Sequence, residues 1–148
     1  MTAHCGQSGS IVPSVVIDFP RAPVAGRRHQ DLTITVERLG ETLVVAVAGD
    51  VDLCTAPMLH DVLDANLSRA PRRIVVDLSL VRFLNAAGLE VLLDAHRRVF
   101  PGTDVRLVAT TRATRRPLQL TRTDERLTVH TSRAAAIAAP RWAAAGTG

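Results

Sequence analysis

The segment AGDVDLCTAP places two carboxylates, Asp50 and Asp52, close to the thiol of Cys54 and the hydroxyl of Thr55. The carboxylates are suited to pairing with arginine on a partner, or to forming the turn and capping the next helix. Cys54 precedes a predicted helix, and a helix N-terminus lowers a thiol pKa, so a redox role is one interpretation. The other is a small buried hydrophobic residue.

Histidine chemistry is sparse. His60 and Asp64 are spaced to share one helix face, but one histidine and one carboxylate do not make a metal site, and a solvated face is expected. His96 falls on the apolar side of its helix and is interpreted as a core-edge residue. Asp77 ends a buried strand, where it would bond to a neighbouring loop. No metal and no cofactor is therefore predicted.

The usual catalytic motifs are missing. The sequence contains no GxxxxGK[ST] or GxGxxG phosphate loop and no GxSxG nucleophile turn. An α/β enzyme would carry its reactive groups at the carboxyl ends of its strands, and no such set is visible. The chain is predicted not to be an enzyme.

The segment FLNAAGL, from Phe83 to Leu89, joins a buried strand to a helix and contains no hydroxyl. Asn85 is expected to be the N-cap of the helix. Ala86 and Ala87 offer no oxygen for modification. Gly88 is expected to leave the surface flat, so that another backbone can approach closely.

Composition favours a small α/β domain. Of 148 residues, 47% are hydrophobic and 3% aromatic, so the core must be aliphatic. All basic residues are arginine, and they concentrate in residues 97–133, whereas residues 39–68 carry acidic residues and no arginine. A basic flank without interleaved aromatic residues is a poor nucleic-acid signature, and it is interpreted mostly as a solvated helix face.

Cysteine spacing and the length of apolar runs indicate the cellular location. Cys5 and Cys54 lack CxxC spacing, which suggests two reduced thiols inside the cell. The apolar run IVPSVVI is short and is stopped by Asp18, so neither a signal peptide nor a membrane span is expected. The chain is predicted to be cytoplasmic.

Hydrophobic periodicity predicts about five strands and about four helices in one domain over residues 31–139. Strands are expected at residues 32–37, 43–49, 74–78, 105–109 and 127–130. Helices are expected from the N-cap Thr55 to residues 69–73, and at residues 85–100, 112–120 and 132–139. Because strands and helices alternate after a leading hairpin, the fold class is α/β with a mixed, mostly parallel sheet. Residues 1–30 are expected to be a flexible extension whose apolar part, residues 12–19, docks on the domain or on a partner. Residues 140–148 are expected to be a loose tail.

Two segments, AGDVDLCTAP at residues 48–57 and VVDLSLVRFLNAAGLEVLL at residues 75–93, lie one predicted helix apart. Together they resemble the STAS domain of bacterial anti-sigma factor antagonists. Gly49, Val51, Asp52, Thr55 and Ala56 fit the first family motif, G-E-[IVL]-D-x-x-[TN]-A. The second motif, V-[IVL]-[DN]-[LM]-[SG]-x-[VL]-x-[FY]-[ILM]-D-[ST]-[SA]-G-[LIV], is matched by Val76, Asp77, Leu78, Ser79, Val81, Phe83, Leu84, Gly88 and Leu89.

The resemblance implies a protein-binding regulator. An antagonist of this family binds an anti-sigma factor that has a kinase-type ATP-binding fold, and so frees the sigma factor. The family's hydroxyl after the motif Asp accepts a phosphate from that anti-sigma factor, which breaks the complex. The implied binding surface is the loop with Asp50, Asp52, Cys54 and Thr55, together with Phe83 and the helix start at residues 85–88.

This sequence departs from the family at the phosphate acceptor. Asn85 stands at the motif Asp, and Ala86 stands at the acceptor, which makes it a degenerate phosphoacceptor. The hypothesis is an anti-sigma factor antagonist that phosphorylation at this position cannot switch off. An alternative stays open: an STAS module that binds a nucleotide or a small apolar ligand in an internal or strand-end pocket. Ser79 is a further but weaker regulatory position, and a homodimer is left open.

Overall fold

A computed structural model describes residues 16–18, 32–99 and 101–140 of the chain. It forms one six-stranded sheet with four α-helices and one short 3₁₀ helix, and the sheet order follows the chain. The elements are β1 (Val16–Asp18), β2 (Leu32–Leu39), β3 (Thr42–Val51), α1 (Ala56–Leu67), β4 (Arg73–Leu84), α2 (Ala86–Val99), β5 (Asp104–Val108), α3 (Arg112–Leu120), η1 (Thr123–Glu125), β6 (Thr128–His130) and α4 (Arg133–Ala138).

The sheet is mixed, as the alternation of elements predicts. β1 with β2 and β2 with β3 pair antiparallel, whereas β3 to β6 run parallel. β2 and β3 form the predicted hairpin, and Gly40 closes it with a φ of +64° that favours glycine. Five predicted strands and four predicted helices are confirmed, and β1 adds a sixth strand.

β1 falls inside the predicted N-terminal extension. Its register pairs Val16 with Thr35 and Asp18 with Thr33 of β2. The sequence left open whether residues 12–19 dock on the domain or on a partner, and the strand pairs with the domain. Most of the predicted extension, and the predicted tail apart from its first residue, lie outside the described residues.

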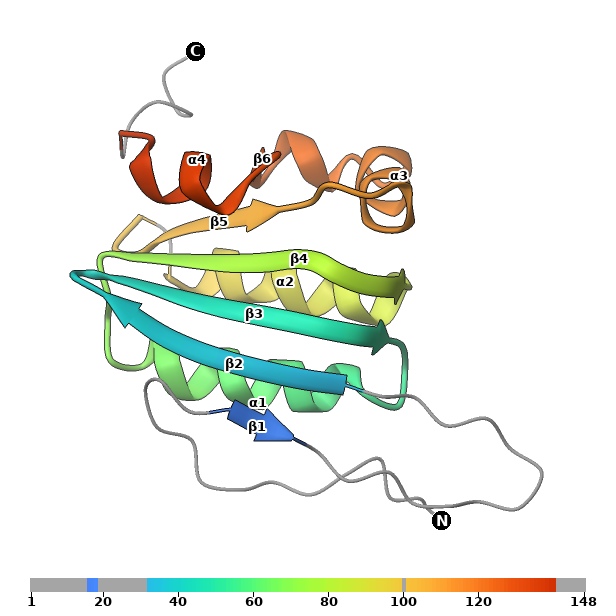
Figure 1. Cartoon of the computed structure of the whole chain (residues 1–148), viewed down its shortest axis with the longest axis horizontal. Coiled ribbons are helices and arrows are strands. Elements are labelled where there is room, and N and C mark those ends of the chain that lie inside the picture. The colour runs from blue at the N-terminus through green and yellow to red at the C-terminus, as the bar shows by residue number, and fades with distance from the viewer. Residues whose placement is uncertain (1–15, 19–31, 100, 141–148) are drawn as a thin grey trace.

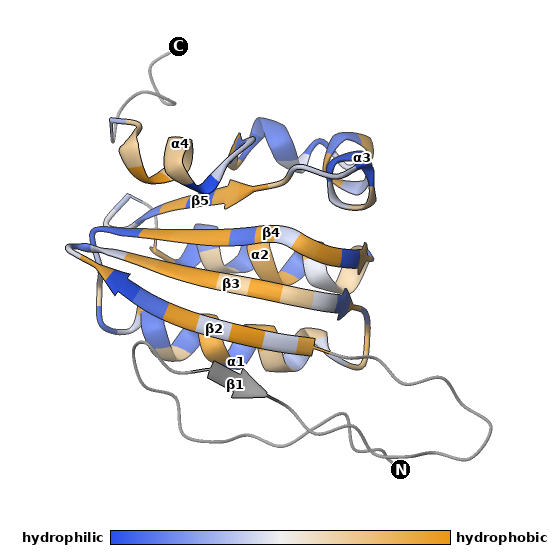
Figure 2. Ribbon diagram, in the orientation of Figure 1, coloured by the Kyte–Doolittle hydropathy of each residue, from blue (hydrophilic) through white to orange (hydrophobic). Residues whose placement is uncertain are grey.

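Helices cover both faces of the sheet. α1 and α2 lie side by side on one face (Figure 1) and bury the main aliphatic core against it. On the other face, Ala136 and Ile137 of α4 pack on Val44, Val75 and Val108. The strands are the most apolar segments (Figure 2), and they carry the period-two pattern where only one face is covered.

β4 is longer than predicted. We expected a strand over residues 74–78, but it continues to Leu84. Against β3, it carries one additional residue between Asp77 and Leu80 and another between Val81 and Phe83. The hydrophobic alternation of β4 is interrupted after residue 78, which is why an earlier end was predicted. The bulges let the strand continue past this interruption.

The basic flank is only partly solvated. The side chain of Arg106 is 1% exposed and pairs with Asp104 at 2.8 Å. It also donates to the carbonyl oxygens of Ala136, Ala139 and Pro140 at 2.6–2.9 Å. The interpretation of this flank as a solvated face is therefore wrong for Arg106, because the carbonyl groups at the end of α4 lie against β5 and require a donor.

Candidate functional site

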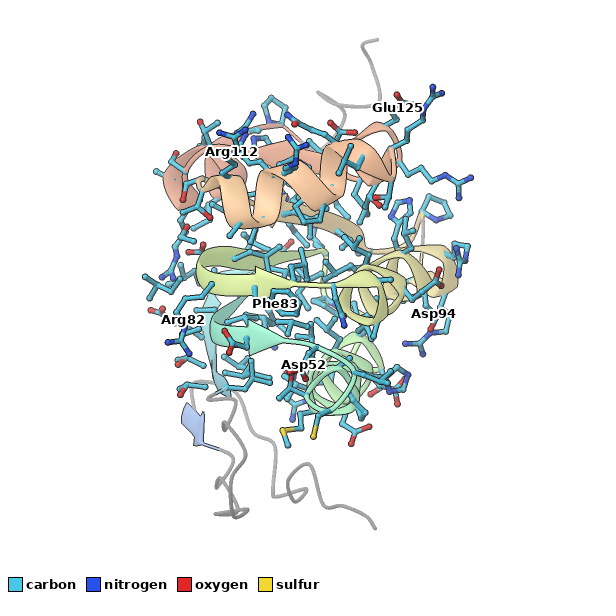
Figure 3. The ribbon with its side chains drawn as sticks, turned by 90° about the vertical axis from the view of Figure 1, so that its right-hand side faces the viewer. Asp52, Arg82, Phe83, Asp94, Arg112 and Glu125 are labelled. Atoms are coloured by element: carbon cyan, nitrogen blue, oxygen red, sulfur yellow. The ribbon has the colours of Figure 1, made fainter. Side chains whose placement is uncertain are left out.

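The two sequence motifs meet at one edge of the sheet. Because β3 and β4 are parallel, their carboxyl ends lie together, with Asp50 opposite Phe83 and Val51 opposite Leu84. The backbone N–H of Asn85 donates to the carbonyl oxygen of Val51 at 3.1 Å and ties the second loop to the first strand. Figure 3 looks onto this edge and shows Asp52, Arg82 and Phe83 there, with Arg112 on α3 above them.

Asp52 organises the loop before α1. One of its carboxylate oxygens accepts hydrogen bonds from the backbone N–H groups of Cys54, at 2.9 Å, and Thr55, at 3.0 Å. The carboxylate therefore forms the turn, which was part of one of its two interpretations, but it accepts from no N–H group within the helix and so does not cap it. Its other oxygen has no hydrogen bond or ion pair among the described residues.

Thr55 is a positioning residue and not a surface residue. It occupies the N-cap position of α1, as predicted, but its hydroxyl caps no helix N–H. Instead, the hydroxyl donates to the carbonyl oxygen of Asp50 at 2.7 Å and accepts from the N–H of Asp52 at 3.0 Å. With 4% of Thr55 exposed, its contribution to a partner surface would come through the shape of this loop.

Asp50 pairs within the domain. Its carboxylate lies 3.4 Å from Nε of Arg82, and both side chains are partly exposed. Gly49 precedes it with a φ of +116°, at the bulge that sets the end of β3 against β4. In the free chain, the arginine beside Asp50 is therefore Arg82 of the same domain, and pairing with an arginine of a partner stays a prediction.

Asn85 caps α2 as predicted. Its side-chain oxygen accepts from the N–H groups of Ala87, at 3.0 Å, and Gly88, at 3.4 Å. Ala86 is exposed, so its methyl group lies on the outer surface of the first helical turn, whereas Ala87 is half-buried and packs against the core. The helix start is intact, but it presents no hydroxyl.

The expectation that Gly88 flattens the outer surface is wrong. Gly88 is buried, and a Cβ placed there would lie 2.6 Å from Val51 Cγ1 and 2.7 Å from Leu84 Cδ1. The glycine lets α2 pack closely on the ends of β3 and β4. The sequence did not show which side of the helix Gly88 occupies, because a glycine carries no hydropathy signal.

Three exposed leucines were not predicted from the sequence: Leu53, Leu80 and Leu120 are each at least 70% exposed. Phe83, which the family resemblance did place on the binding surface, is 50% exposed. The available signal was the run SLVRFL, in which Leu80 and Phe83 break the alternation of a half-buried strand. Together with Ala86, this composition is typical of a contact surface for protein.

A groove adjoins the start of α2. It has a volume of about 590 Å³ and lies between the end of β4, the first turn of α2 and one side of α3. Phe83, Ala86 and Leu120 supply apolar lining, and Arg112 and Arg116 stand on the α3 side. The involvement of α3 could not be predicted from the two family motifs, because the second motif ends at Leu89 in α2.

His60 and Asp64, which the sequence places on one helix face, do not pair with each other. Asp64 pairs with Arg98 of α2 at 2.6 Å, whereas His60 lies 3.4 Å from Asp61. The hydrogen bond from Arg98 holds the pKa of Asp64 below its ordinary value. Among the described residues, no three His, Cys, Asp or Glu side chains come together as a metal site would require.

Asp77 and Ser79 form a structural network. Ser79 donates to one carboxylate oxygen of Asp77 through its hydroxyl and its N–H, and Arg133 of α4 donates to the other oxygen at 2.9 Å. Burial raises the pKa of Asp77, but these donors outweigh it and hold the pKa below its ordinary value. Ser79 therefore serves as a hydrogen-bonding turn residue.

Cys54 corrects the expectation of two reduced thiols. It is half-buried at the start of α1 and is disulfide-bonded. Cys5 lies outside the described residues. The absence of CxxC spacing was a weak guide because cysteines far apart in the sequence can pair whenever the fold brings them close.

Three features together define one class of protein. They are the mixed sheet with helices on both faces, the Asn85-capped start of α2 at the carboxyl ends of β3 and β4, and the two sequence motifs. The chain belongs to the STAS domain family, since residues 34–130 match the family described as Mlab, STAS domain. No helix among the described residues is long and apolar enough to cross a bilayer.

Relatives within this family are named as anti-sigma factor antagonists. The chain is 32% identical over 89 residues to the anti-sigma-F factor antagonist RsfB of Mycobacterium tuberculosis, a match over 60% of this chain and 73% of that protein. It is 34% identical to an anti-sigma factor antagonist from Mycobacterium paratuberculosis, whose crystal structure superposes with a TM-score of 0.70 and covers 72% of this chain and 92% of that one. The unphosphorylated form of the anti-sigma factor antagonist SpoIIAA shares the fold, with a TM-score of 0.58 at 16% identity over 69% of this chain and 91% of that one.

Proposed function

We propose that this protein is an anti-sigma factor antagonist that binds an anti-sigma factor and releases its sigma factor. The observation that carries the proposal is the exposed start of α2, where an intact Asn85 cap presents the methyl group of Ala86 beside Phe83. Small residues at this point let a partner backbone approach closely.

The same site cannot be switched by phosphate in the usual way. Phosphoryl transfer requires a nucleophilic side-chain atom, and Ala86 and Ala87 have none. A phosphate at a helix start would add about −1.5 to −2 charges, which the helix N-terminus tolerates but a closely packed partner does not. The antagonist is therefore constitutively able to bind, and its control lies in its amount or elsewhere in the chain.

The relatives support the partner class that we propose. RsfB is named as an antagonist of anti-sigma-F factor, and we assign an anti-sigma factor with a kinase-type ATP-binding fold as the partner here. Binding is the whole activity: the chain acts in the cytoplasm without catalysis, cofactor or direct contact with nucleic acid. The strand-end pocket that the ligand-binding alternative requires corresponds to the groove beside α2, which we assign below to the protein partner.

The test is capture of the partner from native cell extract, with identification by mass spectrometry. Wild type should bring down an anti-sigma factor, and Ala86→Glu, which puts a negative charge at the acceptor position, should lose it. Ala134→Glu is the matched control, because Ala134 is also exposed in the first turn of a helix, on α4 away from this edge. Equal capture by all three proteins, or capture of no anti-sigma factor, would overturn the proposal.

A further inference from the structure

The groove beside α2 has an apolar floor. Phe83 and Leu120 line it and remain 50% and 70% exposed, and Leu84 and Leu89 lie behind them. The groove is therefore a place where a bound group gains by leaving water. Asn85 and Ala86 belong both to its lining and to the proposed binding surface, so a partner seated on the start of α2 also reaches the groove.

Two arginines on its α3 side have no acidic neighbour. Arg112 and Arg116 lie four residues apart, on one side of α3, and both line the groove. Neither makes a hydrogen bond or an ion pair with any of the described residues. Arg115, between them in sequence, instead donates to the carbonyl oxygen of Ala109 at 3.2 Å.

The electrostatics of α3 favour an added negative charge. The first turn of α3 contains no acidic residue and begins at Arg112, although a helix N-terminus stabilises negative charge and disfavours positive charge. Two like charges four residues apart on a helix also repel each other. Arg82 adds a third guanidinium at the opposite side of the groove, where Asp50 already pairs with it. A carboxylate between Arg112 and Arg116 would relieve both effects.

We propose that the groove receives an apolar side chain of the anti-sigma factor, flanked by carboxylates that pair with Arg112 and Arg116. This inference rests on the proposed function and names the chemistry of the partner segment: an acidic stretch with an apolar anchor. The groove is continuous with the surface at Ala86, and its α3 side supplies charge complementarity for such a segment. The partner thus contacts α3 as well as the two family motifs.

The test uses the purified anti-sigma factor that the wild-type chain captures, with dissociation constants measured by calorimetry. Arg112→Gln/Arg116→Gln should weaken binding about tenfold, because two solvent-exposed ion pairs are lost. Arg112→Glu/Arg116→Glu should weaken it about 100-fold by adding repulsion. Arg112→Lys/Arg116→Lys keeps both charges and should retain affinity within about threefold. Leu120→Asp should weaken binding about tenfold by placing charge on the apolar floor.

The matched control is Arg69→Glu/Arg126→Glu, which makes the same change in net charge at exposed positions outside the groove. Its affinity should stay close to that of wild type. An equal loss in this control would show a non-specific charge effect and overturn the groove proposal. Thermal unfolding of each variant checks folding, and if the glutamate pair does not fold, the glutamine pair and its lysine counterpart carry the test.

Other outcomes separate this proposal from the proposed function. If Ala86→Glu abolishes binding while all groove variants bind like wild type, the function stands and the groove assignment fails. If decanoate shifts the amide NMR signals of the groove while the groove variants bind the anti-sigma factor like wild type, the groove is a small-ligand pocket and the assignment also fails. If light scattering shows a dimer that only the Arg112/Arg116 variants dissociate, a second copy is the occupant. If wild type binds no anti-sigma factor, both proposals fail.

Discussion

Asn85 and Ala86 divide two tasks at the start of α2. Asn85 holds the helix start through its side-chain oxygen, and Ala86 presents a methyl group where the family carries a hydroxyl. The cap and the missing nucleophile follow from residue types at known motif positions, so the sequence predicted both. The cap also explains how the surface keeps its form without the motif Asp.

Replacing Asn85 by alanine should lower the free energy of unfolding by about 1 kcal/mol, because the N–H groups of Ala87 and Gly88 lose their acceptor. Urea denaturation measures the change. Asn85→Asp is the control: it keeps an acceptor oxygen and adds a favourable charge at the helix N-terminus, so its stability should equal or exceed that of wild type. Equal stability of Asn85→Ala and wild type would contradict the capping role.

Other residue roles were beyond the sequence because they depend on neighbours in space. Thr55 was placed correctly at the start of α1, but its hydroxyl bonds the preceding loop. Asp50 finds Arg82 because the bulges of β4 bring the two together across parallel strands. No pattern of types and spacing along one chain shows such a register shift in advance.

At the scale of elements, α2 depends on a close fit to the ends of β3 and β4. Gly88 provides that fit, since its missing Cβ leaves room for the side chains of Val51 and Leu84. Amphipathic periodicity predicted the helix and its buried leucines, and continuous apolar runs predicted the buried strands. Periodicity does not report the distance between a helix and its sheet, so the role of Gly88 was missed.

Gly88→Ala should destabilise the fold by about 1–2 kcal/mol, although glycine to alanine normally stabilises a helix interior by about 1 kcal/mol. The reason is the contact of the new methyl group with Val51, whose β-branched side chain has little freedom to move. Denaturant unfolding of Gly88→Ala, Val51→Ala and the double variant gives the coupling. The double variant should cost less than the sum of the single changes. Additive costs, or a more stable Gly88→Ala, would show that the helix is not held at this distance.

Across the whole molecule, some arginines among the described residues pair within the domain and others do not. The buried Arg106 and the exposed Arg133 tie α4 to the sheet through Asp104, Asp77 and carbonyl groups, whereas Arg112 and Arg116 line the groove and pair with no described residue. Composition predicted one basic flank and could not separate these groups, because burial of an arginine depends on acceptors brought from distant segments. Class and topology were predictable, since alternating strands and helices constrain a chain of this length to few arrangements.

Stability should fall as the pH is lowered from 7.5 to 5.5. Burial, and then Arg106, lower the pKa of His130 below its ordinary value of 6.5; Asp104 opposes them and Arg73 adds a smaller lowering. The folded chain therefore keeps His130 neutral while the unfolded chain takes up a proton, so stability present above pH 6.5 is lost as the pH falls through that value toward the folded-state pKa.

Urea denaturation at pH 7.5 and pH 5.5 measures this loss, and His130→Gln should reduce it. His96 contributes in the same direction, because burial also lowers its pKa. His130→Gln should therefore keep part of the pH dependence of stability, and His96→Gln/His130→Gln should remove more of it. Identical losses in wild type and the double variant would assign the pH dependence to other groups.

The central claim is antagonism, and release of a sigma factor from its complex with the anti-sigma factor measures it most directly. Added wild-type protein should displace the sigma factor in proportion to its amount, and prior incubation with ATP should not weaken it, because Ala86 accepts no phosphate. Ala86→Glu should displace none. Retention of the sigma factor at a large excess of folded wild-type protein, or loss of its activity after incubation with ATP, would contradict the account.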